Sequence, residues 1–194
     1  MNAADVERAI EGRDAVVVTL GISENPLRVR LQGAARTALD VRSAGTRNVI
    51  AAMQKHGVRK LVVQTTYGVG ETRGMLRLVD KLFFQLILKP QIADTEKQNQ
   101  DVTASDLDWV IVQPVHLTDG PDDDMPFVST GGETGRMKVS RKSVGRFLAH
   151  AVENPTFVRQ SVAVSGVLSA RGALAPASND GARTPCSEEG TQVA

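Results

Sequence analysis

Unbroken runs of aliphatic residues recur along the chain and predict strands that are buried on both faces. Four such runs occupy residues 14–20, 59–66, 107–114 and 160–166. Segments with apolar positions three or four residues apart predict helices over residues 4–11, 40–56, 75–88, 92–104 and 140–153. The alternation of solid apolar strands with helices is typical of a doubly wound α/β domain, whose central sheet is parallel.

Glycine and serine mark several of the helix ends. Gly12 and Gly57 follow two of the helical segments, where a left-handed residue ends a helix, and Ser140 stands where an N-cap is expected. Residues 22–39 and 118–136 show neither pattern and are expected to be irregular.

The residues just past each strand are the candidates for a binding site, because open parallel sheets bind ligands at the carboxyl ends of their strands. They are Thr19, Leu20 and Gly21 after the first strand, Thr65, Thr66 and Tyr67 at the second, and Pro114, Val115 and His116 at the third.

Thr66 and His116 are the candidate catalytic pair. If the second and third strands are neighbours, the hydroxyl and the imidazole lie at the same edge of the sheet. There they could orient a substrate carbonyl or a flavin and donate a proton. The alternative is a structural role for both, since threonine is common at strand ends and a lone histidine is often a surface residue.

Length and composition suggest one domain over residues 1–167, followed by a tail. The 194-residue chain is 41% hydrophobic and 23% charged, as in globular proteins. Residues 168–194 are rich in Ala, Ser, Gly, Pro and charge, and we expect them to be disordered. The single cysteine, Cys186, lies in this tail, so the sequence offers no internal disulfide.

Charge and hydropathy exclude several classes of partner. The formal net charge is +1, which gives no electrostatic reason to expect nucleic acid or a membrane surface. The most apolar segment, residues 75–88, contains charged residues and is too short to span a bilayer. No signal-peptide pattern follows Met1, and we expect a cytoplasmic protein that acts on a small-molecule substrate.

Phosphate-binding and metal-binding motifs are weak. Gly68, Gly70 and Gly74 have the spacing G-x-G-x-x-x-G, one residue longer than the dinucleotide fingerprint. His56, His116 and His150 are scattered, so no metal site is expected.

Four segments, in this order and spacing, resemble the atypical short-chain dehydrogenase/reductase group: DAVVVTLG, RNVIAAMQKHGVRKLVVQTTYGVG, SDLDWVIVQPVHLTDGP and VSRKSVGRFLAHAVENP. Within that group the chain looks like NAD(P)H-binding proteins of the NmrA-like and flavin reductase/biliverdin-IXβ reductase kind. The resemblance covers residues 4–166 and implies a Rossmann-like fold with NADP or NAD as cofactor.

The resemblance also implies roles for the strand-end residues. Thr19, Leu20 and Gly21 match positions on the adenosine side of the cofactor. Thr65 and Thr66 match hydroxyl residues that face the nicotinamide, and Tyr67 follows them in the same cofactor site. Pro114, Val115 and His116 match a segment that lines the nicotinamide and substrate pocket.

Two departures from the family pattern matter. The Tyr-x-x-x-Lys pair of short-chain dehydrogenases is absent, because Glu71 stands four residues after Tyr67. Many relatives carry Asp-Lys-Glu where this chain has Asp94, Thr95 and Glu96. General-acid chemistry by a Tyr/Lys couple is therefore not expected.

The largest departure lies at the N-terminus. The family begins with a βαβ unit that holds the glycine-rich diphosphate loop, and the resemblance implies that this unit is lacking here. The strand at 14–20 would then have an open edge, Val16, Val17 and Val18 would lose covering helices, and the edge would offer a template for self-association. Cofactor binding is accordingly expected to be weak or absent.

Three functions stay open from the sequence. The first is a reductase that transfers hydride from NAD(P)H to a flavin, quinone or similar conjugated acceptor, with impaired activity in this chain. The second is a non-catalytic, NmrA-like dinucleotide sensor or scaffold. The third is an inactive fragment.

Overall fold

The computed structural model describes residues 2–21, 38–75, 89–120 and 124–168. Its helices are α1 (Ala3–Ile10), α3 (Val41–His56), α5 (Lys89–Thr103) and α6 (Arg141–Glu153), with 3-10 turns η1 (Gly70–Met75) and η2 (Pro155–Phe157). Its strands are β1 (Ala15–Val18), β2 (Lys60–Gln64), β3 (Asp108–Pro114), β4 (His116–Thr118), β5 (Phe127–Ser129), β6 (Lys138–Ser140) and β7 (Gln160–Ser165).

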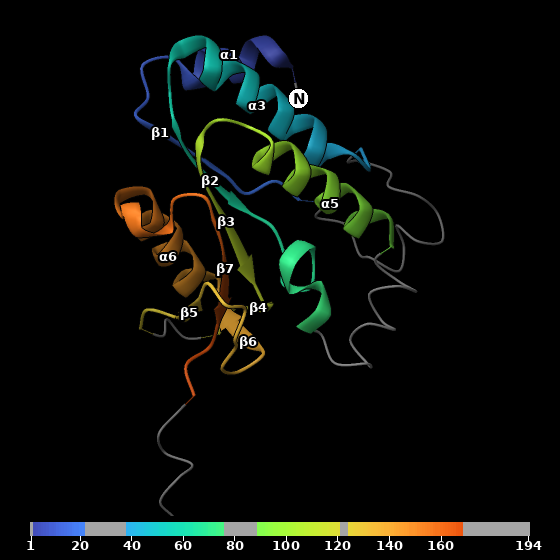
Figure 1. Ribbon diagram of the computed structural model, residues 1–194, viewed down its shortest axis with the longest axis vertical. Coiled ribbons are helices and arrows are strands. Elements are labelled where there is room, and N and C mark those ends of the chain that lie inside the picture. Colours follow the sequence, from blue (N-terminus) through green and yellow to red (C-terminus); the bar gives the residue numbers. More distant parts are fainter. Residues whose placement is uncertain (1, 22–37, 76–88, 121–123, 169–194) are drawn as a thin grey trace, which may run out of the picture.

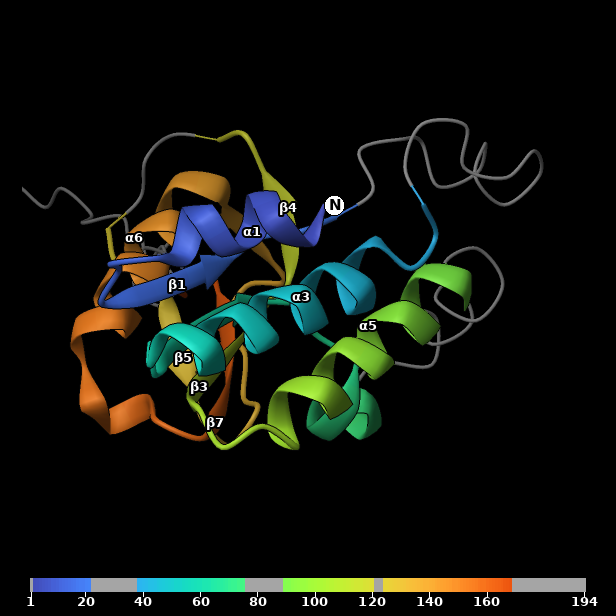
Figure 2. The same cartoon turned by 90° about the horizontal axis from the view of Figure 1, so that it is seen from above.

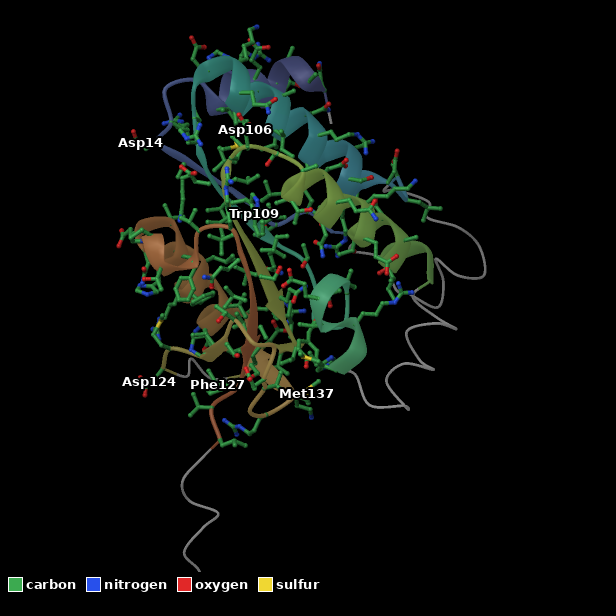
Figure 3. All side chains as sticks on the ribbon, viewed as in Figure 1. Asp14, Asp106, Trp109, Asp124, Phe127 and Met137 are labelled. Carbon is green, nitrogen blue, oxygen red and sulfur yellow. The ribbon has the colours of Figure 1, made fainter. Side chains whose placement is uncertain are left out.

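The five-stranded central sheet has the order β1-β2-β3-β7-β5. The first four of these strands are parallel, and β5 pairs antiparallel with β7. Strands β4 and β6 form a separate parallel pair. The predicted α/β class with a mainly parallel sheet is therefore confirmed. Figure 3 marks the two ends of the sheet, with Asp14 and Asp106 near the amino ends and Phe127 and Met137 toward the carboxyl end.

Helices cover both faces of the sheet, as unbroken aliphatic strands require. Helices α3 and α5 lie on one face and α6 lies on the other (Figures 1 and 2). Alternate residues of β2 divide between the two cores. Leu61 and Val63 pack with α1 and α3, whereas Val62 packs with α6 around Phe147.

The expected helix ends are present. Gly57 ends α3 in the left-handed conformation, with φ 70°, and Gly12 has φ 69° just after α1. The Ser140 hydroxyl caps α6 by accepting a hydrogen bond from the backbone N–H of Ser143 at 3.0 Å. Each of these residues does what its type favours locally, so these ends could be read from sequence.

Three expectations need correction. Strand β1 spans only Ala15–Val18, shorter than predicted. The stretch expected to be irregular contains β5, because residues 127–129 pair with β7, and residues 116–118 and 138–140 pair as β4 and β6. Val18 is 4% exposed beneath α1 and α3, so it has not lost its cover, whereas Val17 is 43% exposed.

Several expectations fall outside the described residues. These are the irregular stretch 22–37, most of the helix predicted at 75–88, and the tail 169–194 with Cys186. The domain boundary and the missing first βαβ unit stay predictions.

Candidate functional site at the carboxyl edge of the sheet

Backbone hydrogen bonds bring two of the three predicted strand ends to one edge of the sheet. Strands β2 and β3 are aligned so that Gln64 lies beside Val112. The ladder continues past both strands, because the N–H of Tyr67 donates to the carbonyl of Pro114 at 3.0 Å and the N–H of Val115 donates to that of Val164 at 3.0 Å. The segments at residues 65–67 and 114–116 are therefore neighbours.

The two threonines after β2 differ in their surroundings. Thr65 is buried, its N–H donates to the carbonyl of Val112 at 2.8 Å, and its Oγ1 has no hydrogen-bond partner. Thr66 is half-buried. Both threonines lie beyond the end of β2 at Gln64, and the next residue, Tyr67, packs in the core on the α6 side.

His116 lies at the start of β4, beside Lys138 of β6, and its side chain is exposed. Pro114 and Val115, which precede it, are both buried. No hydrogen bond joins Thr66 to His116 in the described part of the chain. Their joint role in one site stays a prediction.

The side chain of Tyr67 makes a hydrogen bond that the sequence did not predict. It is buried, and its hydroxyl donates to the carbonyl of Gly132 at 3.0 Å. Burial raises the pKa of this phenol, so Tyr67 is neutral at ordinary pH. The contact ties the end of β2 to the loop before β6.

Buried polar side chains lie behind this edge, on the α5 side. Gln113 is fully buried, and its Nε2 donates to the carbonyl of Val69 at 2.8 Å. The Oε1 of Gln113 and the Oδ1 of Asn99 have no hydrogen-bond partner. Gly70, with φ 62°, packs against Asn99, and Asn99 borders a cavity of about 480 Å³ between η1 and α5. These two oxygens can still accept hydrogen bonds from an internal water or from donor groups of a ligand.

The third predicted strand end, after β1, has different surroundings. Thr19 and Gly21 are exposed, and Leu20 is half-buried against the core beneath α1 and α3. Gly21 lies beside the guanidinium of Arg42, from the first turn of α3. Arg42 was not among the residues predicted from sequence.

Asp94, on α5, caps the N-terminus of α3. Its carboxylate accepts hydrogen bonds from the backbone N–H groups of Arg42 (3.0 Å) and Ser43 (3.2 Å) and from the Ser43 hydroxyl (2.5 Å). Asp40 stands at the N-cap position itself but makes no side-chain capping bond. A cap supplied from another helix gives no local sequence signal, which is why it was missed.

Metal-binding clusters and membrane-spanning helices are both absent from the described residues. No three His, Cys, Asp or Glu side chains in these ranges gather where they could hold a metal ion. None of the described helices has the length and apolar character needed to cross a membrane.

Comparison with known proteins identifies the family. A family model described as NAD(P)H-binding matches residues 1–155. The chain belongs to this NAD(P)H-binding family. The resemblance inferred from sequence is thereby confirmed at the level of the family, and it makes the strand ends described above the expected place for the dinucleotide.

Solved structures share the fold. A short-chain dehydrogenase/reductase from Veillonella parvula in complex with NADP is 16% identical, with a TM-score of 0.65, covering 85% of this chain and 68% of that one. ChuY, an anaerobillin reductase from Escherichia coli O157:H7, is 20% identical with a TM-score of 0.65, covering 91% of this chain and 74% of its own. The oxidoreductase YlbE from Lactococcus lactis is 14% identical with a TM-score of 0.63, covering 89% and 71%.

Proposed function

We propose that this protein is an NAD(P)H-dependent reductase whose acceptor is a flavin, a quinone or a similar conjugated molecule. The observation that supports it most is the shared carboxyl edge of β2 and β3, where the segments 65–67 and 114–116 are hydrogen-bonded neighbours in a chain of the NAD(P)H-binding family. The cofactor supplies a hydride, and the chain must hold both reactants and handle one proton.

The residues present fit the nicotinamide half of the cofactor. Thr66 offers a half-buried hydroxyl, and the Val115 backbone is fixed by its bond to β7. The buried, partnerless hydroxyl of Thr65 leaves one donor and acceptor for a bound molecule or water. In the proposal, Thr66 orients the acceptor, and His116, which solvent can reach, donates the proton that accompanies hydride transfer.

A second candidate function, dinucleotide sensing without turnover, has one specific observation in its favour. The side chain of Tyr67 is committed to Gly132, and the position where many relatives carry a lysine holds Thr95, which is buried and bonded to the carbonyl of Gln91 at 2.8 Å. The described residues therefore offer no Tyr/Lys acid at this edge.

Steady-state oxidation of NADPH with flavin mononucleotide or a quinone distinguishes these functions. We expect turnover in the wild type and a fall in kcat/KM of about a hundredfold in His116→Ala, because positioned acids contribute about 10²–10⁴-fold. His150→Ala is the matched control, since His150 is an exposed histidine on α6. NADPH binding without turnover would favour the sensor.

A further inference from the structure

Arg42 has an unsatisfied donor at the carboxyl end of β1. A Cβ built on Gly21 would lie 3.2 Å from its Nη2, so the guanidinium rests against the Gly21 backbone. The Nε of Arg42 is buried and has no hydrogen-bond partner. Burial also lowers the pKa of Arg42, against the opposing effect of Asp94. A half-buried guanidinium with a free donor can still bind an anionic hydrogen-bond acceptor.

No acidic side chain in the described ranges supplies that anion. The ion pairs of these ranges involve other cations, and Arg42 forms none. Asp94 is the nearby carboxylate, but its oxygens accept bonds from two backbone N–H groups and the Ser43 hydroxyl. Asp94 attracts the guanidinium electrostatically, but its oxygens are used by the N-terminus of α3, and no carboxylate of the described ranges forms an ion pair with Arg42.

We infer that Arg42 binds a phosphate group on the adenosine half of the dinucleotide. The planar fork of arginine suits phosphate oxygens, which can accept two parallel hydrogen bonds from it. Because Gly21 has no side chain, a ligand can approach the guanidinium along the strand end. The identity of the ligand rests on the proposed function, whereas the anion site itself does not.

Two phosphates of the cofactor share this chemistry, namely the diphosphate and the 2′-phosphate of NADP. Titrations with NADPH and NADH separate them, because only the first carries the 2′-phosphate. Inorganic pyrophosphate is a third probe, which reports on the anion site without the nicotinamide. All three can be followed in ¹⁵N-resolved NMR spectra through the Gly21 amide and the Arg42 Nε–H.

We expect each probe to shift the Gly21 and Arg42 resonances of the wild type. Arg42→Gln should weaken NADPH binding by about tenfold or more, the factor that one charged hydrogen bond gives. Arg47→Gln is the matched control, because Arg47 lies on the same helix but is exposed and paired with Asp101 at 3.0 Å. That control should bind NADPH as the wild type does.

Two further variants guard against loss of the fold. Arg42→Lys keeps the charge without the fork and should bind NADPH with intermediate affinity. Gly21→Ala keeps the arginine but places a methyl group against it, and should also weaken binding. The emission of Trp109, the single tryptophan, reports whether each variant is folded.

The outcomes separate this inference from the proposed function. If Arg42→Gln weakens the binding of NADPH alone, the inference is supported and the bound group is the 2′-phosphate. If it weakens the binding of NADPH and NADH equally, the inference is supported and the bound group is the diphosphate. If pyrophosphate shifts the Arg42 resonance but the protein shows no turnover, the anion site is supported and the proposed reductase function is contradicted. Equal NADPH affinity in wild type and Arg42→Gln, or no shift at Arg42 with any probe, overturns the inference.

Discussion

Strands β1 and β3 have similar aliphatic sequences but very different surroundings. Strand β3 is hydrogen-bonded on both sides, and its Val110, Ile111 and Val112 are at most 1% exposed. Strand β1 is paired only with β2 in the described part of the chain, and Val17 is 43% exposed. A run of valines therefore identifies a strand, but it does not tell whether the strand lies in the centre of the sheet or at its edge.

The same contrast divides the candidate site. The ends of β2 and β3, expected to face the nicotinamide, are held by ladder bonds and buried neighbours. The end of β1, expected on the adenosine side, is exposed and has Arg42 as its charged neighbour. Substitutions at the ends of β2 and β3 should therefore change turnover, whereas substitutions at the end of β1 should change the affinity for the cofactor.

The largest expected effect is on stability at the centre of the sheet. Val112→Ala should lower the free energy of unfolding by about 2–3 kcal/mol, because it removes fully buried methyl groups. Val17→Ala makes the same chemical change at the edge and should cost below about 1 kcal/mol. Urea unfolding followed by Trp109 emission measures both, and equal losses would remove the distinction between the two strands.

The next effect concerns the helix that carries Arg42. Asp94→Ala should lower the free energy of unfolding by about 2 kcal/mol, because it leaves the α3 N-terminus uncapped. Asp101→Ala, which breaks only the partly exposed pair with Arg47, should cost below about 1 kcal/mol. The same urea experiment measures both. A smaller cost for Asp94→Ala than for Asp101→Ala would contradict the capping role.

Self-association through β1 would further distinguish this edge strand from the central strand β3. We propose that copies of this chain associate through β1, whose outer edge has no partner strand among the described residues and adjoins an apolar hollow of about 450 Å³ shared with α1. Light scattering during gel filtration should show mass that rises with protein concentration, and Val17→Lys should restore the monomer. Val167→Lys, at another exposed valine, should not. A wild type that stays monomeric would refute the proposal.

The smallest effect is a titration shift at the ordered edge. Tyr67 is the only tyrosine, so ultraviolet absorbance reads its ionisation alone. Burial raises the pKa, so the folded protein should titrate above the value of about 10 seen in urea. Folded protein then holds the proton more tightly than unfolded protein, and this part of the stability is present below pH 10 and lost as the pH rises further. Matching pKa values would show that Tyr67 is not buried.

The sequence predicted features that depend on local chemistry. The four main strands, the glycine ends of α1 and α3, and the Ser140 cap follow from residue type and spacing. Strand β5 was missed because it is three residues long and is stabilised by distant pairing with β7. Short edge strands depend on partners that a local pattern does not show.

The site was predictable only in outline. Its location followed from the rule for parallel sheets, and the alignment of residues 65–67 with 114–116 agrees with that rule. Arg42 and Asp94 could not be found in this way, because their contacts join α3 to residues 21 and 94, far away in the sequence. The bond from Tyr67 to Gly132 likewise spans two loops.

Calorimetric titration of the purified chain with NADPH tests the central claim most directly. The claim is that the nicotinamide side of the site is well ordered, while the adenosine side, at the edge strand β1, grips weakly. It predicts a dissociation constant above about 100 μM, weaker than about −5.5 kcal/mol. A dissociation constant near 1 μM would contradict it, because such affinity requires a complete grip on both halves of the dinucleotide.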